Sequence, residues 1–404
     1  MSLSKRGWKS VLRTSSARVT LSVPREEGVV HRRTASYLGC GLLESAMSRS
    51  SFFEVVTKRP TILGTGLITL DVILGADGNR GPWLCTGGTC GNVLTIMSYL
   101  GWQAFPVARL NGDAASRHVE EDLKRWEVHL DHARTTPGSR TPIVVHRIFK
   151  TPEGLPFHRF SWTCPNCGAW LPGYRPVLAS AARSIAERLA SPKVFFLDRV
   201  SRAALLLAKA CIAKGALVFF EPSGLGEPRL FREALGLAHI LKYSNERVRS
   251  LQGAGHGEGP VLEIETLGAE GLRYRSRIAG ARTDGWERLE AYQVAELRDA
   301  GGAGDWCTAG ILHGLAQNGL AGLTTIRRSQ LEEALRFGQA LAAWNCGFEG
   351  ARGGMYAVDK PTFRRQVQSI ISQGGSKAAQ REVPSPGVRE AFECICPACG
   401  HEVA

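Results

Sequence analysis

From Pro60 onward, short apolar runs alternate with stretches that have helical spacing. The apolar runs predict strands at 61–64, 104–108, 194–198, 216–221, 240–244 and 261–268. Between them, apolar positions spaced by about 3.6 residues predict helices at 92–100, 114–127, 179–189 and 203–213, and a long helix opens at Gly304. Because strands that alternate with helices form βαβ units, we expect an α/β fold whose central, mainly parallel sheet is covered by helices on both faces.

Other segments do not follow this alternation. Residues 143–149 predict a strand on a small sheet or lid, and residues 150–176, rich in Pro, Gly and aromatic residues, are expected to be irregular. Residues 370–390 are rich in Gly, Ser, Lys, Gln and Pro and predict a linker to a Cys-rich tail. The expected divisions are a basic, disordered extension at 1–58, a main domain at 59–368 with lid segments near 66–90 and 140–176, and the linker and tail at 369–404.

Composition and charge exclude some classes of protein. The 404 residues are 44% apolar and 22% charged, as in folded globular proteins, and no apolar stretch reaches the ~18 residues that a membrane-spanning helix needs. The net charge is +13, but residues 1–46 hold eight Lys or Arg against three Glu, and the remaining charge is scattered. We therefore expect a cytoplasmic protein without a membrane or nucleic-acid partner. The basic tail is interpreted as a transit peptide or as an upstream extension that ends near Met47.

The strongest local signal is the Gly cluster that opens the last predicted helix, where residues 299–305 read DAGGAGD. Successive backbone N–H groups of Gly302, Ala303 and Gly304 at a helix N-terminus would form an anion hole for a transferring phosphoryl group. Asp305, in the first turn, would accept the proton of a substrate hydroxyl. A Gly-rich helix start in which Asp305 only stabilises the first turn is the alternative.

This cluster resembles the C-terminal signature of the PfkB or ribokinase-like carbohydrate kinases, D-T-x-G-A-G-D, with Ala in place of the usual Thr. Gly87, Gly88 and Asn92 are similar to the family's G-G-x-x-x-N helix start, and the resemblance extends over about residues 61–350. It implies a ribokinase-like three-layer sandwich with a small β lid. It also implies ATP- and Mg²⁺-dependent transfer of the γ-phosphoryl group to a hydroxyl of a sugar, with Asp305 as general base.

The resemblance implies further roles on both sides of this loop. Asp71 matches the family's first-strand Asp, which hydrogen-bonds substrate hydroxyls. The residues implied to bind the substrate are Asp71, Gly87, Gly88 and Asn92. Arg247 stands where family members often carry a Glu linked to magnesium placement. The late helix and loop around Asn345 resemble the family's adenine and monovalent-cation region. The residues implied to bind ATP are Lys242, Thr266, Gly268, Gly271 and Asn345.

Two C-P-x-C-G knuckles are not part of the family pattern. In each, the C-x-x-C turn lets two thiolates face one ion, so the pair predicts a tetrahedral, structural Zn²⁺ site. Such a site would clip the tail onto the 150–176 segment, within one chain or across a homodimer. Redox-active thiols are the alternative reading, and Cys394 and His401 are alternative ligands. The four predicted ligands are Cys164, Cys167, Cys396 and Cys399.

Three other functions remain open at this point. A nucleoside kinase would place a hydroxyl before the same Asp305, so the expected partner is a small-molecule sugar or nucleoside. A non-catalytic sugar- or nucleotide-binding regulator would keep the fold and would explain Ala300 and Arg247, although the presence of Asp305 argues against it. A zinc-dependent nucleic-acid binder would use the knuckles and the basic charge, but the knuckles lie far apart in the sequence.

Overall fold

The computed structural model describes most of the main domain and part of the tail. The described residues are 51–53, 59–75, 81–135, 138–152, 154, 156–247, 259–373 and 388–399. Most of the predicted basic extension, the stretch 374–387 and His401 lie outside them. Among the described residues, no helix combines the length and apolarity that crossing a membrane requires.

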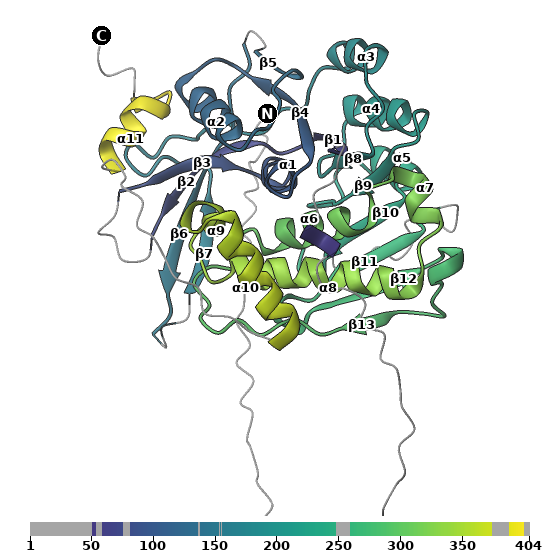
Figure 1. Cartoon of the computed structure of the whole chain (residues 1–404). Coiled ribbons are helices and arrows are strands. Elements are labelled where there is room, and N and C mark those ends of the chain that lie inside the picture. The colour runs from purple at the N-terminus through teal and green to yellow at the C-terminus, as the bar shows by residue number, and fades with distance from the viewer. Residues whose placement is uncertain are drawn as a thin grey trace, which may run out of the picture. The chain divides into compact units, whose positions relative to one another are not determined.

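A nine-stranded sheet forms the centre of the fold (Figure 1), in the order β13-β12-β11-β10-β9-β8-β1-β4-β5. Neighbouring strands are parallel from β5 through β11, and β12 and β13 are antiparallel to their neighbours. The predicted central, mainly parallel sheet is thereby confirmed. The strands are β1 (Thr61–Thr65), β4 (Gln103–Leu110), β5 (Ala133–Thr135), β8 (Val194–Leu197), β9 (Leu217–Phe220), β10 (Ile240–Ser244), β11 (Leu262–Thr266), β12 (Leu272–Ser276) and β13 (Glu287–Leu289).

The central strands bury both of their faces. In β8 and β9, Phe196 and Phe219 pack into one apolar core, whereas Phe195 and Val218 pack into a second core on the opposite face. Successive side chains of a strand point to opposite faces, so a strand covered on both sides is apolar throughout. This is why the short runs without polar residues were readable as strands.

Helices cover both faces of this sheet and complete the predicted three layers. On one face, α3 (Ala179–Glu187), α4 (Arg202–Ile212) and α5 (Pro228–Leu237) bury apolar side chains in the smaller core. The larger core receives side chains from α1 (Thr89–Tyr99), α2 (Ala114–Arg125), α6 (Ala303–Leu315), α7 (Gly319–Thr324), α8 (Arg328–Asn345), α9 (Gly353–Ala357) and α10 (Lys360–Gln373). Three short 3₁₀ turns are η1 (Ser51–Phe53), η2 (Gly268–Glu270) and η3 (Ala279–Ala281).

The predicted lid segments form a second sheet with the strand order β3-β2-β6-β7. Its strands are β2 (Thr69–Leu74), β3 (Trp83–Gly87), β6 (Ile143–Lys150) and β7 (Pro156–Ser161). The expectation that residues 150–176 are irregular is wrong for β7. This edge strand leaves Phe157 and Phe160 44% and 47% exposed, so it lacks the alternation of buried and polar positions that marks most strands.

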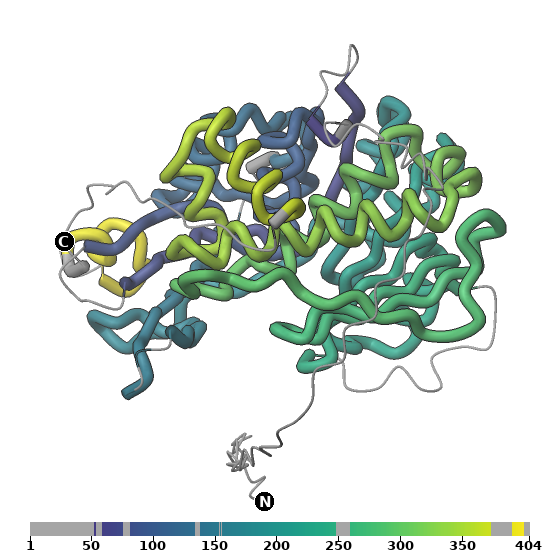
Figure 2. Tube along the Cα trace, turned by 60° about the horizontal axis from the view of Figure 1, so that its bottom comes forward, coloured from purple at the N-terminus to yellow at the C-terminus, as the bar shows by residue number. Residues whose placement is uncertain are grey.

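Two predicted boundaries differ from the structure. The stretch expected to begin the linker at residue 370 is the end of α10, where Ile370 is buried together with Phe363 and Val367 at helical spacing. Within the predicted extension, Phe52 of η1 stacks on Phe337 of α8 with ring centroids 4.3 Å apart. The C-terminal α11 (Val388–Ile395) contacts α2 and lies beside the lid sheet (Figures 1 and 2).

Candidate active site

The Gly-rich loop before α6 has a backbone shape that only glycine tolerates. Gly302 caps the helix with φ 75° and ψ −3°, and a Cβ atom there would lie 2.3 Å from the carbonyl oxygen of Ala351. Asp299 fixes the start of the loop, because its carboxylate accepts the N–H groups of Gly301 (2.7 Å) and Gly350 (2.9 Å). One of the three expected anion-hole donors is already engaged, because the N–H of Ala303 donates to the carbonyl oxygen of Ala300 over 3.2 Å. An anion in the hole would have to share or replace this bond.

Asp305 lies half-buried in the first turn of α6. Asn92 of α1 donates its side-chain amide to Asp305 Oδ2 over 2.7 Å, so the predicted base and a predicted substrate residue touch. Burial, and then the negative charge of Glu221, raise the pKa of Asp305 to about 7, against the opposing effects of Asn92, Arg247 and Lys242. A carboxyl group whose pKa is near neutral can take up and release a proton at physiological pH.

A buried ion pair between Glu221, which follows β9, and Lys242 of β10 contacts the start of α6. Lys242, predicted to bind ATP, donates to Glu221 Oε1 at 2.5 Å and to the carbonyl oxygen of Gly304 at 3.2 Å. Thr308 donates its hydroxyl to the other Glu221 oxygen over 2.6 Å. The negative charge of Glu221 raises the pKa of Lys242 even though burial opposes the charged form. Lys242 therefore contacts the anion-hole loop directly.

Asp71 on the lid strand β2 is buried, and its carboxylate occupies the space beside Gly87 that a side chain at that position would need. A Cβ atom on Gly87 would lie 1.9 Å from Asp71 Cγ, so a side chain at that position would displace the carboxylate. Thr69 donates its hydroxyl to Asp71 Oδ1 over 2.6 Å, yet burial raises the pKa of Asp71 to about 6. Gly88 has φ 76° and approaches the backbone of Leu67 closely. The two glycines of the G-G-x-x-x-N pattern thus leave room for Asp71 and for the turn that precedes it.

Arg352 is a buried residue that sequence reasoning missed. Its guanidinium donates to Asn92 Oδ1 (3.1 Å), Asp122 Oδ2 (2.7 Å) and the carbonyl oxygen of Thr86 (2.5 Å). Tyr356 donates its hydroxyl to the other Asp122 oxygen over 2.6 Å. This network fixes Asn92 beside Asp305. No local signal marks Arg352 in a chain with 50 Lys and Arg residues.

Asp198 and Glu221 were also not predicted as site residues, but a signal for them exists. Each directly follows a buried strand, β8 or β9, and the carboxyl ends of parallel strands meet at the edge of an open α/β sheet where ligands bind. Asp198 accepts the N–H of Leu67 over 2.9 Å and pairs with Arg199 at 2.7 Å. Burial raises its pKa to about 7.

The turn predicted to bind ATP, Thr266–Gly271, follows β11, the strand that pairs with β10. Thr266 ends β11, and its hydroxyl donates to Tyr243 O over 3.4 Å, next to the end of β10. Gly268 and Gly271 both have positive φ, and a Cβ atom on Gly271 would lie 2.2 Å from Leu289 O. The Thr266–Gly271 turn therefore lies at the same sheet edge as Lys242.

Asn345 has a different environment from the other predicted ATP residues. It is fully buried at the end of α8, and its amide donates to the carbonyl oxygens of Gly350 (3.2 Å) and Ala351 (3.1 Å). Its side-chain oxygen accepts the N–H of Gly354 over 3.3 Å. These bonds fix the loop behind Gly302, and the structure does not bring the Asn345 side chain together with the Thr266–Gly271 turn.

A cavity of about 460 Å³ borders the substrate side. It reaches Leu67, whose carbonyl oxygen accepts the N–H of Gly91 over 3.2 Å, so it adjoins the turn that leads to Asp71. Its walls are mainly aromatic and apolar, with one cation. The lining residues are Leu67, Trp162, Trp170, Leu171, Gly173, Tyr174 and Arg199.

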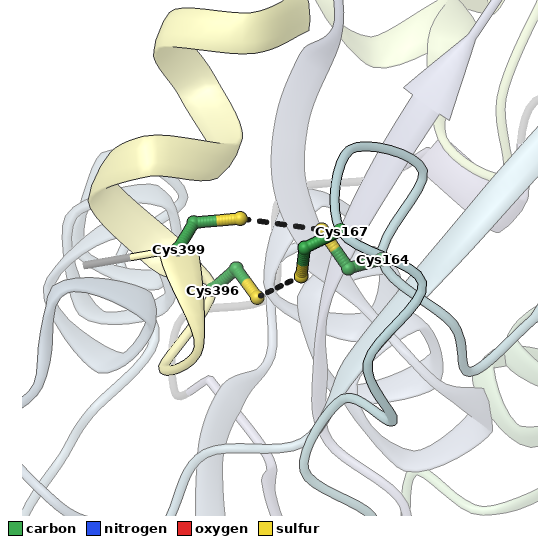
Figure 3. Close-up of side chains that lie close together, drawn as sticks. All are labelled: Cys164, Cys167, Cys396 and Cys399. Carbon is green, nitrogen blue, oxygen red and sulfur yellow. Dashed lines mark hydrogen bonds between the residues drawn. The ribbon is translucent and has the colours of Figure 1, made fainter. Parts of the chain in front are cut away.

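The two predicted knuckles meet in space within a single chain (Figure 3). The four sulfur atoms of Cys164, Cys167, Cys396 and Cys399 lie within 4.8 Å of one another, although the knuckles are far apart in the sequence. The Cys164–Cys399 pair is 3.7 Å apart and the Cys167–Cys396 pair 3.8 Å, and all four are free thiols. Cys394 is exposed and is not part of this cluster.

The sheet, the lid and the loop at Asp305 together define a ribokinase-like α/β fold of the kind found in small-molecule kinases. Residues 186–356 match the model of the pfkB family carbohydrate kinase, and the predicted resemblance to this family is confirmed. Among curated protein sequences, none matches this chain significantly.

Solved structures share the fold at low sequence identity. A fructokinase with bound ATP from Xylella fastidiosa is 20% identical, with a TM-score of 0.55 over 72% of this chain and 93% of that one. Ribokinase from Arabidopsis thaliana, complexed with ribose and ATP, is 18% identical, with a TM-score of 0.55 over 78% and 99%. A nucleoside kinase from Burkholderia thailandensis in complex with inosine is 16% identical, with a TM-score of 0.55 over 76% and 96%.

Proposed function

We propose that this protein is an ATP-dependent kinase that transfers the γ-phosphoryl group to a hydroxyl of a sugar or sugar-like molecule. The observation that carries the proposal is Asp305. It combines a pKa of about 7 with a position in the first turn of α6, directly after the Gly-rich loop, and it contacts Asn92. In this role Asp305 accepts the hydroxyl proton while the helix N-terminus stabilises the charge on the phosphoryl group.

The surrounding residues fit this chemistry. Asp71 and Asn92 offer the carboxylate and amide that would hold substrate hydroxyls, and the N–H groups of Gly302 and Gly304 would bind the phosphoryl oxygens. ATP would lie along the sheet edge from the Thr266–Gly271 turn to the Gly302 loop. A monovalent cation near the Asn345 loop and a cytoplasmic location stay predictions.

Magnesium would reach the site on the phosphates of ATP, as it does in most kinases. Glu221 offers a carboxylate against the first turn of α6, near the loop that would bind phosphate; it would hold an ion in addition to its bonds with Lys242 and Thr308. When bound, Mg²⁺ neutralises charge on the transferring group. Arg247, which replaces the implied Glu, offers no ligand for a cation, so Glu221 is the residue that we assign to hold the ion.

A nucleoside is the second candidate substrate, and the 460 Å³ cavity favours it. Trp162, Trp170 and Tyr174 line this cavity next to Leu67, and aromatic rings stack well on a planar base. A simple hexose or pentose would leave these rings uncovered, and Trp170 is 81% exposed in the structure. A sugar that carries an aromatic or heterocyclic group would satisfy both the hydroxyl site and the cavity.

The knuckle cluster is assigned to a structural Zn²⁺ ion. A tetrahedral ion with Zn–S bonds of about 2.3 Å separates its sulfur atoms by about 3.8 Å, close to the 3.7 and 3.8 Å of the two pairs. The ion would clip α11 onto the segment that carries Trp162 and Trp170. It would thereby support one wall of the cavity and take no part in the phosphoryl transfer.

The test is ATP consumption with Mg²⁺ against a panel of sugars and nucleosides, with Asp305→Asn run alongside. Removal of a general base lowers kcat by about 10²–10⁴-fold, and we expect substrate binding to persist. Turnover by Asp305→Asn at the wild-type rate would exclude Asp305 as base. Thermal stabilisation by a sugar or nucleoside, without phosphorylated product from the wild type, would replace the kinase with a non-catalytic binding regulator.

A further inference from the structure

Two histidines of the lid converge on the carboxylate that opens the Gly-rich loop. His158 Nδ1, on β7, lies 3.1 Å from Asp299 Oδ1, and His146 Nε2, on β6, lies 3.6 Å from Asp299 Oδ2. The two imidazole rings meet edge to face with centroids 5.1 Å apart. One ligand atom from each of the three residues lies within 4.8 Å of the others. Asp305 is not one of the members of this cluster.

His146 carries the unusual feature of this cluster. Its side chain is 1% exposed, and within the part of the chain that the structure describes, its Nε2 atom has no hydrogen-bond partner. Buried polar atoms are almost always hydrogen-bonded, and an unmatched one often marks an ion or a water molecule. The Nε2 atom faces Asp299 at a distance too long for a hydrogen bond, which leaves space between the imidazole and the carboxylate.

We propose that His146, His158 and Asp299 bind a divalent transition-metal ion of the zinc class, in a second metal site distinct from the cysteine cluster. Two imidazoles and a carboxylate are a common ligand set for such ions. Ligand atoms about 2.0–2.1 Å from a tetrahedral ion lie about 3.4 Å apart. His158 Nδ1 lies 3.1 Å from Oδ1 of Asp299, at hydrogen-bond distance, and His146 Nε2 lies 3.6 Å from Oδ2, so each imidazole already lies near one oxygen of the carboxylate at about this spacing.

The surroundings of Asp299 suit a metal ligand. Its two oxygens already accept the N–H groups of Gly301 and Gly350, and hydrogen bonds of this kind orient ligating carboxylates in metal sites. The ring of Phe160 lies 4.7 Å from that of His146 and 5.0 Å from that of His158, so it covers one side of the pair. Three protein ligands leave a fourth position for water or another small ligand.

The ion would join two parts of the fold that the sequence separates widely. His146 and His158 belong to neighbouring lid strands, whereas Asp299 starts the loop that ends at Asp305. A metal bound among them fixes the lid sheet against this loop. The inference concerns metal binding and holds whether or not the protein is a kinase.

The test is metal stoichiometry on the full chain. The protein is stripped with a chelator, loaded with Zn²⁺ or Co²⁺, separated from free metal by gel filtration and analysed for bound metal. We expect two ions per wild-type chain, one of them in the cysteine cluster. His158→Gln should retain one ion, and because His158 is partly exposed this variant is expected to fold. The matched control His118→Gln, a histidine of α2 outside the cluster, should retain both ions.

Cobalt separates the two sites by their ligands. Co²⁺ bound by four thiolates gives intense sulfur-to-metal charge-transfer bands, whereas Co²⁺ bound by nitrogen and oxygen gives only weak bands. His158→Gln should therefore lose one cobalt without a change in the thiolate bands. One ion per chain in both wild type and His158→Gln would overturn the proposal. Loss of the thiolate bands in His158→Gln would overturn it as well, because that would trace the effect to the cysteine cluster.

Discussion

The loop at Asp305 and the cysteine cluster both join segments that are distant in the sequence, but they do so by different means. At the loop, protein groups match one another: Asp299 accepts two backbone N–H groups, and Arg352 connects Asn92 to Asp122. In the cluster, the sulfur atoms contact each other at 3.7 and 3.8 Å, and thiols are weak donors and acceptors. Hydrogen bonds and ion pairs between protein groups shape the loop, whereas weak thiol contacts join the ligands of the cysteine cluster, and we expect the cluster to depend on an ion.

Removing one thiol should have the largest effect. Structural zinc sites in small peptides contribute roughly 10–16 kcal/mol of apparent binding free energy, shared among their four ligands. A serine hydroxyl is not a zinc ligand of this kind, so the loss of one thiolate should weaken binding enough to release the ion on gel filtration. We expect Cys396→Ser to bind one metal ion fewer per chain and to show faster amide hydrogen exchange in α11. Cys394→Ser is the matched control, because Cys394 is exposed and lies outside the cluster. Equal metal content in the two variants would show that the cysteine cluster does not depend on a bound ion, and the contrast with the loop at Asp305 would not hold.

The Arg352 network should give the next largest effect. Removing one partner of a buried ion pair costs about 3–5 kcal/mol of the free energy of unfolding, because the remaining charge, here Asp122, loses its partner. We expect Arg352→Met to be destabilised by this amount in urea denaturation, with weaker turnover because Asn92 loses a partner. Arg59→Met removes the exposed Arg59–Glu127 pair and should cost no more than about 1 kcal/mol. Similar costs for both variants would show that the buried network does not organise the loop.

The charges around Asp305 should give the smallest effect, on the pH dependence of kcat/KM. A base must be deprotonated, so activity should rise with pH through the pKa of about 7. Arg247 lowers this pKa and Glu221 raises it. We therefore expect Arg247→Gln to move the rise to higher pH, because the variant loses the positive charge that lowers this pKa. An unchanged profile, or a shift to lower pH, in Arg247→Gln would mean that another group controls the profile.

Much of the architecture was predictable because the sheet is buried on both faces. The bounds of β10, 240–244, were predicted without error, and β8, β9 and α6 begin within one residue of the predicted positions. β7 escaped detection because it is an exposed lid strand. The end of α10 is buried at helical spacing, but the Gly-, Ser- and Lys-rich stretch that directly follows it was interpreted together with it as a linker. Burial produces the periodicity on which sequence prediction depends, and exposed elements show little of it.

For the candidate site, the sequence by itself determined the residues whose role depends on local backbone shape. Gly302 is required by a left-handed φ, Asp305 by its place in a first helical turn, and each knuckle by its own tight turn. Only the tertiary structure revealed Arg352 and joined Glu221 to Thr308 and His146 to Asp299. Their contacts connect residues more than 80 positions apart. Short-range patterns carry no information about such pairs, because their proximity results from the packing of the whole fold.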